Sequence, residues 1–249
     1  MLTFLTKRDF IERSDGTLLG AAWTLLSPFF LISIYAFFFS EIFNLKYANG
    51  EGGKTVLIMT LQGLSTHWYF IESLNKSASI LSRRKVYLTR TKIKVAQIIN
   101  ASFLSSSVTF LFTQTIIITI ALLTQGQSLI DFFWAASIFL SLIFMLLLTH
   151  VVAIMSVYIK DIKNLISTIG PGMIFLSPIF YSIENINPVI KLFISLNPIT
   201  IPILIAKKTN ITQEAFETPL HLFVSMLLFM IIIFTLLYKK VAKNVAEDL

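Results

Sequence analysis

The 249-residue sequence contains no cysteine. This absence excludes disulfide bonds, thiolate metal sites and cysteine nucleophiles. Charged side chains are also scarce, at 13% of the chain, whereas hydrophobic residues make up 55% and the mean hydropathy is +0.80. So little polar surface cannot cover a soluble globule, and the composition therefore predicts a protein that lies in a lipid bilayer.

The sequence lacks a complete nucleotide-binding or catalytic motif. Gly53-Lys54-Thr55 is similar to the end of a P-loop, but the first glycine of that motif would fall at Ala48 and no predicted strand precedes it. Acidic and histidine residues are scattered near the ends of apolar runs; they include Glu41, Glu72, Asp131, His67 and His150. A membrane enzyme acting on polyprenyl phosphates would need such groups gathered at one site, so it is the less favoured alternative.

Long apolar runs recur at lengths suited to transmembrane helices, which need about 20 residues. They predict an all-α integral membrane helical bundle that forms a single transmembrane domain over residues 1–249. An interfacial helix at 1–18 precedes six spans, at 18–43, 56–71, 97–124, 132–157, 165–183 and 220–238. Residues 184–206 are predicted to form a re-entrant segment. The first apolar run is too long for a signal-peptide core, so we expect the N-terminus to be retained.

Residues 165–204 hold five of the seven prolines, although this stretch is apolar enough for hydrocarbon. Proline removes a backbone donor and clashes with the preceding turn, so the stretch is predicted to bend or break. Broken backbone at membrane depth persists only where protein or a water-filled cavity satisfies its polar groups. The pattern therefore indicates the wall, lid or mouth of a passage. A kinked packing helix followed by an ordinary loop is the alternative.

The net charge of +7 is interpreted as membrane topology and not as nucleic-acid binding. With six spans, fifteen of the twenty Lys and Arg residues fall on the side that carries both termini and residues 73–96 and 158–164. Cytoplasmic loops are enriched in Lys and Arg. The sequence therefore predicts that both termini are cytoplasmic and that the proline-rich stretch ends on the outer side.

Two side-chain patterns within the spans suggest roles. Ser102, Ser106, Thr109 and Thr113 share one helical face, which favours helix packing over the lining of a pore. Aromatic residues repeat every seven positions in the first span. Two more lie just after Pro178, near the proposed outer mouth. These candidate path residues are Trp23, Phe30, Phe37, Phe180 and Tyr181. Most of the chain's aromatic rings are expected to face lipid or other helices. His150 is interpreted as a hydrogen-bonded interfacial residue near a span end, in preference to a ligand.

Four motifs follow in order along nearly the whole chain. They are Arg8-Asp9 leading to Leu19-Gly20-Ala21-Ala22-Trp23 and Pro28, then Ser82-Arg83-Arg84-Lys85-Val86, Lys160-Asp161-Ile162, and Ser177-Pro178-Ile179-Phe180-Tyr181 with Asn197-Pro198-Ile199-Thr200. Together they resemble the membrane subunit of type-2 ABC exporters, which move lipid-linked polysaccharide such as O-antigen or capsule. One departure is Tyr87-Leu88, where related sequences often have Phe-Pro.

The resemblance implies an assembly and a cargo. It implies a homodimer in a bacterial inner membrane, bound to two copies of a separate ABC ATPase that binds ATP and magnesium, with no cofactor on this chain. The cargo would be undecaprenyl-pyrophosphate-linked polysaccharide moving through a channel at the dimer centre, with O-antigen favoured over capsule. A related permease for teichoic acid, a lipid or a drug is the alternative.

The resemblance also implies roles for individual residues. Residues proposed to form the path or gate are Trp23, Phe30, Phe37, Pro178, Phe180, Tyr181, Asn197 and Pro198. Those proposed to contact the ATPase or the lipid pyrophosphate are Arg8, Asp9, Arg83, Arg84, Lys85 and Asp161. Guanidinium groups pair well with phosphate oxygens, which supports the second role for the arginines. Plain positive-inside anchoring is the alternative for any one of them.

Overall fold

The computed structural model describes residues 2–11, 19, 22–38, 53–91, 93–125, 132–184, 186–207 and 213–240. Within these ranges the regular elements are all helices, which confirms the all-α prediction. They are α1 (Leu2–Ile11), α2 (Ala22–Phe37), α3 (Gly53–Arg83), α4 (Lys85–Arg90), α5 (Val95–Gln125), α6 (Phe132–Tyr158), α7 (Ile162–Ile169), η3 (Gly170–Ile174), α8 (Pro188–Ser195), α9 (Thr200–Lys207) and α10 (Gln213–Lys240). The second half of the predicted interfacial segment, residues 39–52 and the C-terminal tail lie outside the described residues.

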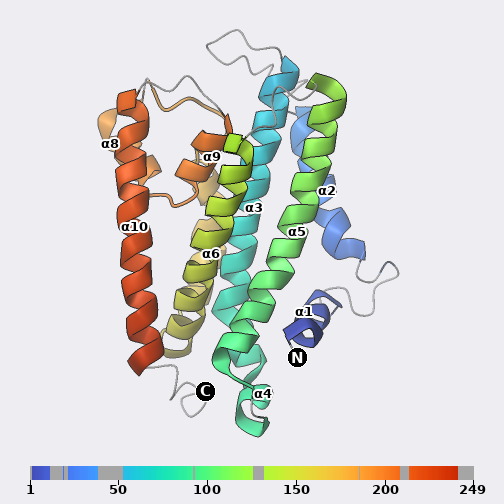
Figure 1. Ribbon diagram of the computed structural model, residues 1–249, viewed down its shortest axis with the longest axis vertical. Helices are drawn as coiled ribbons and strands as arrows, with labels where there is room; N and C mark the ends of the chain where they lie inside the picture. The colour runs from blue at the N-terminus through green and yellow to red at the C-terminus, as the bar shows by residue number, and fades with distance from the viewer. Residues whose placement is uncertain are drawn as a thin grey trace.

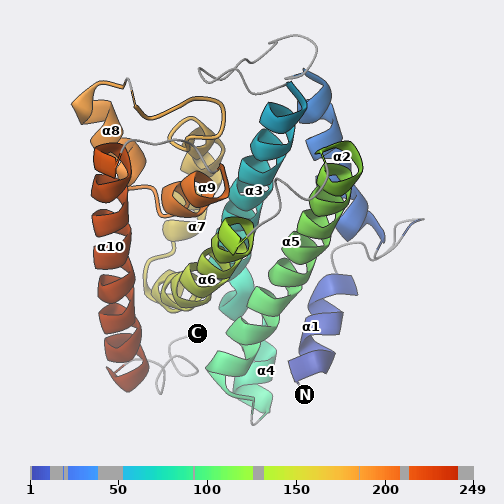
Figure 2. The same cartoon turned by 45° about the horizontal axis from the view of Figure 1, so that its top comes forward.

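Helix α3 is the centre of the bundle. It packs chiefly against α5 and α6, while α2 lies against α3 and α5, and α10 lies against α6 and α9 (Figure 1). Helix α1 packs against α5 at the same end of the molecule as α4 and the end of α10. Helices α8 and α9 lie at the opposite end, with α9 between α10 and α3 in both ribbon views (Figure 2). The bundle thus has one end made by α1 and α4 and another made by the proline-rich stretch.

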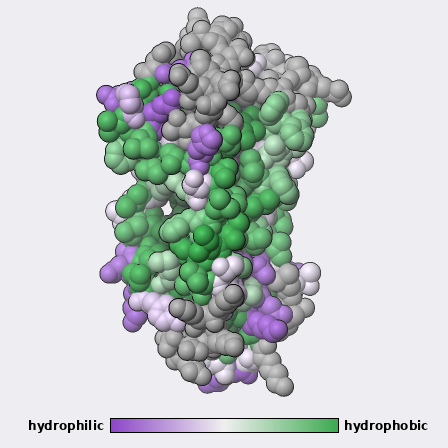
Figure 3. All heavy atoms as spheres, turned by 60° about the vertical axis from the view of Figure 1, so that its left-hand side comes forward, coloured by the Kyte–Doolittle hydropathy of each residue, from purple (hydrophilic) through white to green (hydrophobic). Residues whose placement is uncertain are grey.

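An apolar belt surrounds the middle of the bundle. Figure 3 shows apolar side chains across the middle of one face and polar side chains toward both ends. Among the described residues, Val95–Thr124, Phe132–Tyr158 and Pro219–Tyr238 are long and apolar enough to cross a membrane. Helices α8 and α9, which bend by 100° at their junction, would together make a fourth span. The chain is therefore a membrane protein, and six spans stay a prediction.

Helix α3 continues past residue 71, where the sequence predicted the second span to end, and reaches Arg83. No glycine or proline interrupts residues 64–91, so nothing local stops the helix. At about 1.5 Å per residue its 31 residues extend about 46 Å. The first part of the predicted basic loop is therefore helical, with Lys76 buried inside the bundle and Arg83 exposed at the end of the helix.

The proline-rich stretch is broken, as the sequence predicted. Helix α7 ends at Ile169, a single 3₁₀ segment follows, and residues 175–184 form turns. The α-helix therefore covers only the first part of the predicted fifth span, because Gly170-Pro171-Gly172 follows it and Pro171 disfavours helical backbone at the preceding residue. Helix α8 starts with Pro188 at its first position, and the Asn187 side chain accepts a hydrogen bond from the Val189 backbone N–H at 2.9 Å.

Buried polar side chains tie the three central helices together. The Gln62 side-chain amide of α3 donates to Ser137 Oγ of α6 at 3.2 Å. Gln114 of α5 donates to Ser65 Oγ of α3 at 2.7 Å and accepts from Trp134 Nε1 of α6 at 3.2 Å. Since buried polar groups are costly without partners, these bonds set the relative register of α3, α5 and α6.

Two sequence predictions about side-chain packing are confirmed. The four hydroxyl residues Ser102, Ser106, Thr109 and Thr113 are all buried on the packed face of α5. His150 is buried between α6 and α10, where Nδ1 lies 2.8 Å from the Leu146 carbonyl oxygen and the ring packs on Phe234 and Tyr238. Both sets of residues therefore contribute to helix packing.

Candidate functional site

Three neighbouring cavities follow one face of α3 from the middle of the bundle to its α1–α4 end. The α3 residues on this face repeat at helical spacing and are Trp68, Glu72, Asn75, Ser79 and Arg83. Glu72 and Asn75 line both the first and the second cavity, and Arg83 lines both the second and the third. We call the three cavities together the α3 groove.

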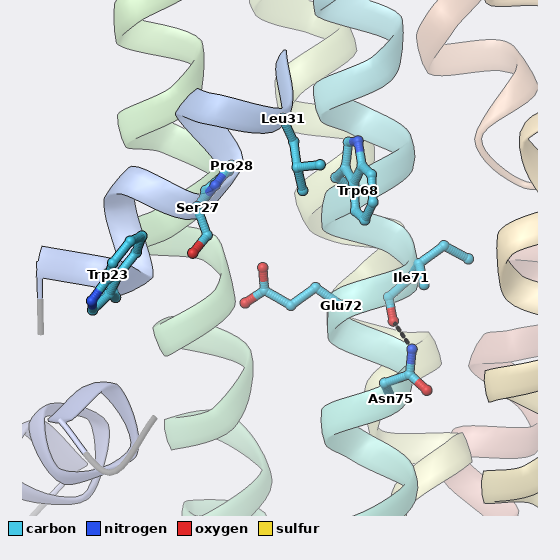
Figure 4. A pocket seen from close by; sticks show the side chains of 8 residues that line it. All are labelled: Trp23, Ser27, Pro28, Leu31, Trp68, Ile71, Glu72 and Asn75. Atoms are coloured by element: carbon cyan, nitrogen blue, oxygen red, sulfur yellow. Dashed lines mark hydrogen bonds between the residues drawn. The ribbon is translucent and has the colours of Figure 1, made fainter. Parts of the chain in front are cut away.

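The first cavity, the aromatic pocket, has a volume of about 440 Å³ and lies between α2 and α3. Its lining residues are Trp23, Ser27, Pro28, Leu31, Trp68, Ile71, Glu72 and Asn75. In Figure 4 the Glu72 side chain extends from α3 toward α2, and the Asn75 amide donates to the Ile71 carbonyl oxygen at 3.0 Å. The pocket thus has two indole rings and a carboxylate at its junction with the next cavity.

The predicted stripe on the first span meets this pocket at one residue. Trp23 lines it, whereas Phe30 and Phe37 are not among its lining residues and are 51% and 61% exposed on the outer face of α2. The sequence did not identify Trp68, which supplies the facing aromatic surface from α3. An indole in a predicted interfacial belt was the only signal, and it is also the ordinary signature of a span end.

The second and third cavities are lined by charged residues. The mixed pocket, of about 490 Å³, is lined by Asp9, Glu72, Asn75, Lys76, Ser79, Arg83 and Lys163. The basic pocket, of about 530 Å³, is lined by Arg8, Arg83, Arg84, Val86 and Tyr87. The α3 groove therefore changes from an apolar, aromatic surface to a cationic one as it approaches the α1–α4 end.

An ionic cluster of Asp9, Glu72, Lys76 and Arg84 connects α1 to α3 beside the mixed pocket. Lys76 Nζ lies 3.1 Å from a Glu72 carboxylate oxygen and 3.7 Å from a carboxylate oxygen of Asp9. Arg84 lies 3.7 Å from the other oxygen of Asp9, and Lys76 also donates to Ser105 Oγ on α5 at 3.0 Å. Asp9, Lys76 and Arg84 are all buried. Charges this deep persist only when paired, so the cluster fastens α1 to the bundle.

Tyr87 forms part of the floor of the basic pocket. The guanidinium carbon of Arg8 lies 5.2 Å from the centre of the Tyr87 ring, and that of Arg84 lies 5.8 Å from it. Aromatic rings attract guanidinium groups at these distances. Tyr87 therefore helps to hold two cations at one site.

The structure brings together most of the predicted charged residues but not all. Arg8, Asp9, Arg83 and Arg84 meet at the basic and mixed pockets. Lys85 and Asp161 are exposed and line neither pocket. Glu72, Lys76 and Lys163 were missed as site residues; the i, i+4 spacing of Glu72 and Lys76 was the signal for their ion pair.

At the opposite end, hydrogen bonds join the turns at residues 176–179 to Asn197 and Lys207. We call this hydrogen-bonded region, residues 175–184 and 196–207, the cap. The Asn197 side-chain amide donates to Ser177 Oγ at 2.9 Å and to the Leu176 carbonyl oxygen at 3.2 Å. Its carbonyl oxygen accepts from the Ile199 backbone N–H at 3.3 Å. Asn197 and Ser177 are buried, and each precedes a proline. Two of the predicted motifs thus meet in space.

The predicted aromatic residues of this stretch pack inside the cap. The Tyr181 hydroxyl donates to the Phe175 carbonyl oxygen at 2.8 Å, and both Phe180 and Tyr181 are partly buried against apolar neighbours. Pro178 is buried and Pro198 is partly buried. All five predicted residues of this end therefore belong to one compact region.

Lys207, at the end of α9, is the main cap residue that the sequence did not identify. Its side chain is 2% exposed, and Nζ donates to the carbonyl oxygens of Pro178 and Ile179, the latter at 2.7 Å. Turns leave carbonyl groups without helical partners, and Lys207 satisfies two of them. From the sequence it belonged to a polar segment outside the membrane, so only the tertiary structure reveals this contact.

Comparison with known proteins agrees with this architecture. Residues 2–209 match the family described as ABC-2 type transporter. The chain is also similar to a protein named O-antigen export system permease protein RfbA from Myxococcus xanthus, with 21% identity over 201 residues, which cover 80% of this chain and 75% of that protein. The family match covers every element of the α3 groove and of the cap. The chain belongs to the ABC-2 type transporter family.

Proposed function

We propose that this chain is the permease subunit of an ATP-driven exporter that moves undecaprenyl-linked polysaccharide out of the cytoplasm, with O-antigen as the first candidate and capsule as the second. The observation that carries this proposal is the family match over residues 2–209, together with the likeness to an O-antigen export permease over most of the chain. The family implies an ABC ATPase partner. We place the complex in a bacterial inner membrane as a permease homodimer with two ATPase copies.

The α3 groove supports an amphipathic cargo. A lipid-linked glycan combines a polyprenyl tail, a diphosphate and sugars whose C–H faces stack on aromatic rings. The aromatic pocket offers Trp23 and Trp68, and the adjoining pockets offer cationic side chains that pair with phosphate oxygens. The order of these surfaces along α3 matches a cargo whose diphosphate is held at the cytoplasmic end while its apolar and sugar parts contact the bilayer depth.

The α1–α4 end supports docking of the ATPase. Val86 is exposed on α4 beside Lys85, and Asp161 is exposed immediately before α7. These residues lie in two segments, 73–96 and 158–164, that we assign to the cytoplasm together with both termini. The two segments and the termini carry fifteen of the twenty Lys and Arg residues. In this proposal the ATPase contacts these residues and moves α1 and α3 when it closes on ATP.

The cap supports a gate at the outer end. Hydrogen bonds from Asn197, just before α9, and from Lys207, at its end, hold the turns at residues 176–179. In this closed arrangement the backbone carbonyl groups of Leu176 and Ile179 have hydrogen-bond donors. Opening requires those bonds to be exchanged for others or for water in a passage. The paired helices α8 and α9 would then be the re-entrant segment at the mouth of the channel in the dimer.

Deletion of the gene in its native host, followed by glycan analysis, tests the proposal. Lipid-linked polymer should accumulate inside the cell while surface polysaccharide disappears. Complete absence of polymer would instead support the alternative of a membrane enzyme, and normal surface glycan would support another cargo such as teichoic acid, a lipid or a drug. Complementation with wild-type protein should restore surface glycan.

A further inference from the structure

We propose that Asp9 occupies a position that phosphate oxygens of the cargo take during loading, so that binding of a lipid-linked diphosphate to Lys76 and Arg84 releases the turn of α1 that carries Asp9. This inference rests on the proposed function and adds a regulatory step to it. The ionic cluster would act as an internal latch that is opened by the cargo itself.

The contacts of Asp9 are those of a replaceable ligand. Its two carboxylate oxygens each lie 3.7 Å from a cation, one at Lys76 and one at Arg84. Charge-assisted hydrogen bonds between nitrogen and oxygen are typically about 2.7–2.9 Å long, so neither contact is optimal. A diphosphate has more oxygens and more charge than one carboxylate, and it could approach both cations at closer range.

The cations of the cluster can be reached from two sides. Lys76 lines the mixed pocket and Arg84 lines the basic pocket, while Arg83 lines both. Each pocket exceeds the roughly 300 Å³ at which small-molecule sites begin. The two pockets are lined by five cationic side chains and two anionic ones, so the local charge favours an added anion.

Loss of the Asp9 contacts would change how α1 is held without detaching it. Leu5 of α1 is buried in the apolar cluster formed with residues of α3, α5 and α6, and it stays in place when Asp9 is displaced. Asp9 lies one turn further along the same face of α1, and its ion pairs hold that turn against Lys76 and Arg84. Exchange of Asp9 for phosphate would therefore let α1 tilt about Leu5, at the end proposed to meet the ATPase.

The assembled exporter in nanodiscs of zwitterionic lipid can test this latch. Because the chain has no cysteine, a single Thr3→Cys substitution on the exposed side of α1 accepts one environment-sensitive fluorophore. Farnesyl diphosphate is the probe, and farnesol is its control without phosphate. We expect the diphosphate, but not farnesol, to change the emission, and we expect Lys76→Met to abolish the change.

The Asp9→Asn variant supplies the decisive comparison. It should show the released emission before any ligand is added and should bind farnesyl diphosphate at least about fivefold more tightly than wild type. Asp9→Glu should retain the closed emission, and Lys7→Gln, which alters an exposed charge on the same helix, should behave as wild type. Equal affinity of wild type and Asp9→Asn, or an unchanged emission at saturating diphosphate, would overturn the latch while leaving export of lipid-linked glycan in place.

Two further outcomes separate the source of the phosphate. If phosphatidylglycerol in the nanodisc produces the same emission change as farnesyl diphosphate, the cluster senses an ordinary lipid head group and the cargo latch is overturned. If farnesyl diphosphate binds neither protein, the latch is also overturned, and the glycan analysis of the deletion strain then decides independently whether the proposed cargo stands.

Discussion

Asn197 donates a hydrogen bond of 2.9 Å to Ser177, twenty residues earlier in the chain, and both residues are buried immediately before a proline. The bond joins the turns after η3 to the turn between α8 and α9. Both prolines lie in the turns that follow a helical segment, and the side chains before them satisfy each other across the two turns. This relationship explains how an apolar stretch with five prolines can pack with its polar groups satisfied.

Replacing Asn197 with Ala should weaken the cap. The change leaves the Leu176 carbonyl oxygen and Ser177 Oγ without this donor, and buried polar groups without partners cost about 1–3 kcal/mol. We expect surface polysaccharide to fall while the protein remains in the membrane fraction, as measured by glycan blotting and membrane fractionation. Ser167→Ala, an exposed serine on α7, is the matched control. Wild-type surface glycan in Asn197→Ala would remove the gating role of this contact.

Replacing Lys207 with Met should lower the stability of the cap. Two carbonyl oxygens, those of Pro178 and Ile179, lose their donor, which predicts a loss of about 2–4 kcal/mol in the free energy of unfolding. Thermal unfolding of the purified protein in detergent measures the effect as a lower Tm. Lys191→Met on the neighbouring α8 makes the same change in charge and should have little effect, so equal Tm values for the two variants would contradict the prediction.

Removing the indole rings of the aromatic pocket should impair export. Trp23→Ala and Trp68→Ala each delete one of the facing aromatic surfaces, and we expect lipid-linked polymer to accumulate inside the cell in both variants. Phe132→Ala is the control, because Phe132 is 79% exposed at the start of α6 and lines none of the three groove cavities. Export at the wild-type level in both tryptophan variants would exclude the aromatic pocket from the cargo path.

Replacing Asp161 with Ala should lower transport-coupled ATP hydrolysis in the assembled complex. Asp161 is exposed before α7, in the segment that we propose to meet the ATPase, and its removal should cost little stability. ATPase activity with and without cargo measures the coupling, and Asp161→Glu should retain it. If Asp161→Ala hydrolyses ATP with unchanged coupling, this contact is not part of the interface.

The sequence predicted features that depend on local properties. Apolar length and composition indicated a helical membrane protein, and the cluster of prolines in residues 165–204 indicated the stretch in which helices break. The spacing of four hydroxyl residues predicted a packed face of α5. All four are buried: Ser102, Ser106, Thr109 and Thr113. The i, i+4 spacing of Glu72 and Lys76 was also visible in the sequence. Glu72 was interpreted as a residue near a span end and Lys76 as part of a basic loop.

Hydropathy and backbone chemistry act within a few residues. The sequence by itself therefore predicts that the protein lies in a lipid bilayer, that it is helical, and that its proline-rich stretch is broken. The tertiary structure decided which distant groups complete each other. Asp9 reaches Lys76 and Arg84, and Lys207 reaches Pro178, because helix packing encloses these charged side chains where water is scarce. A buried charge must then find its partner in space, and no local pattern specifies which partner that is.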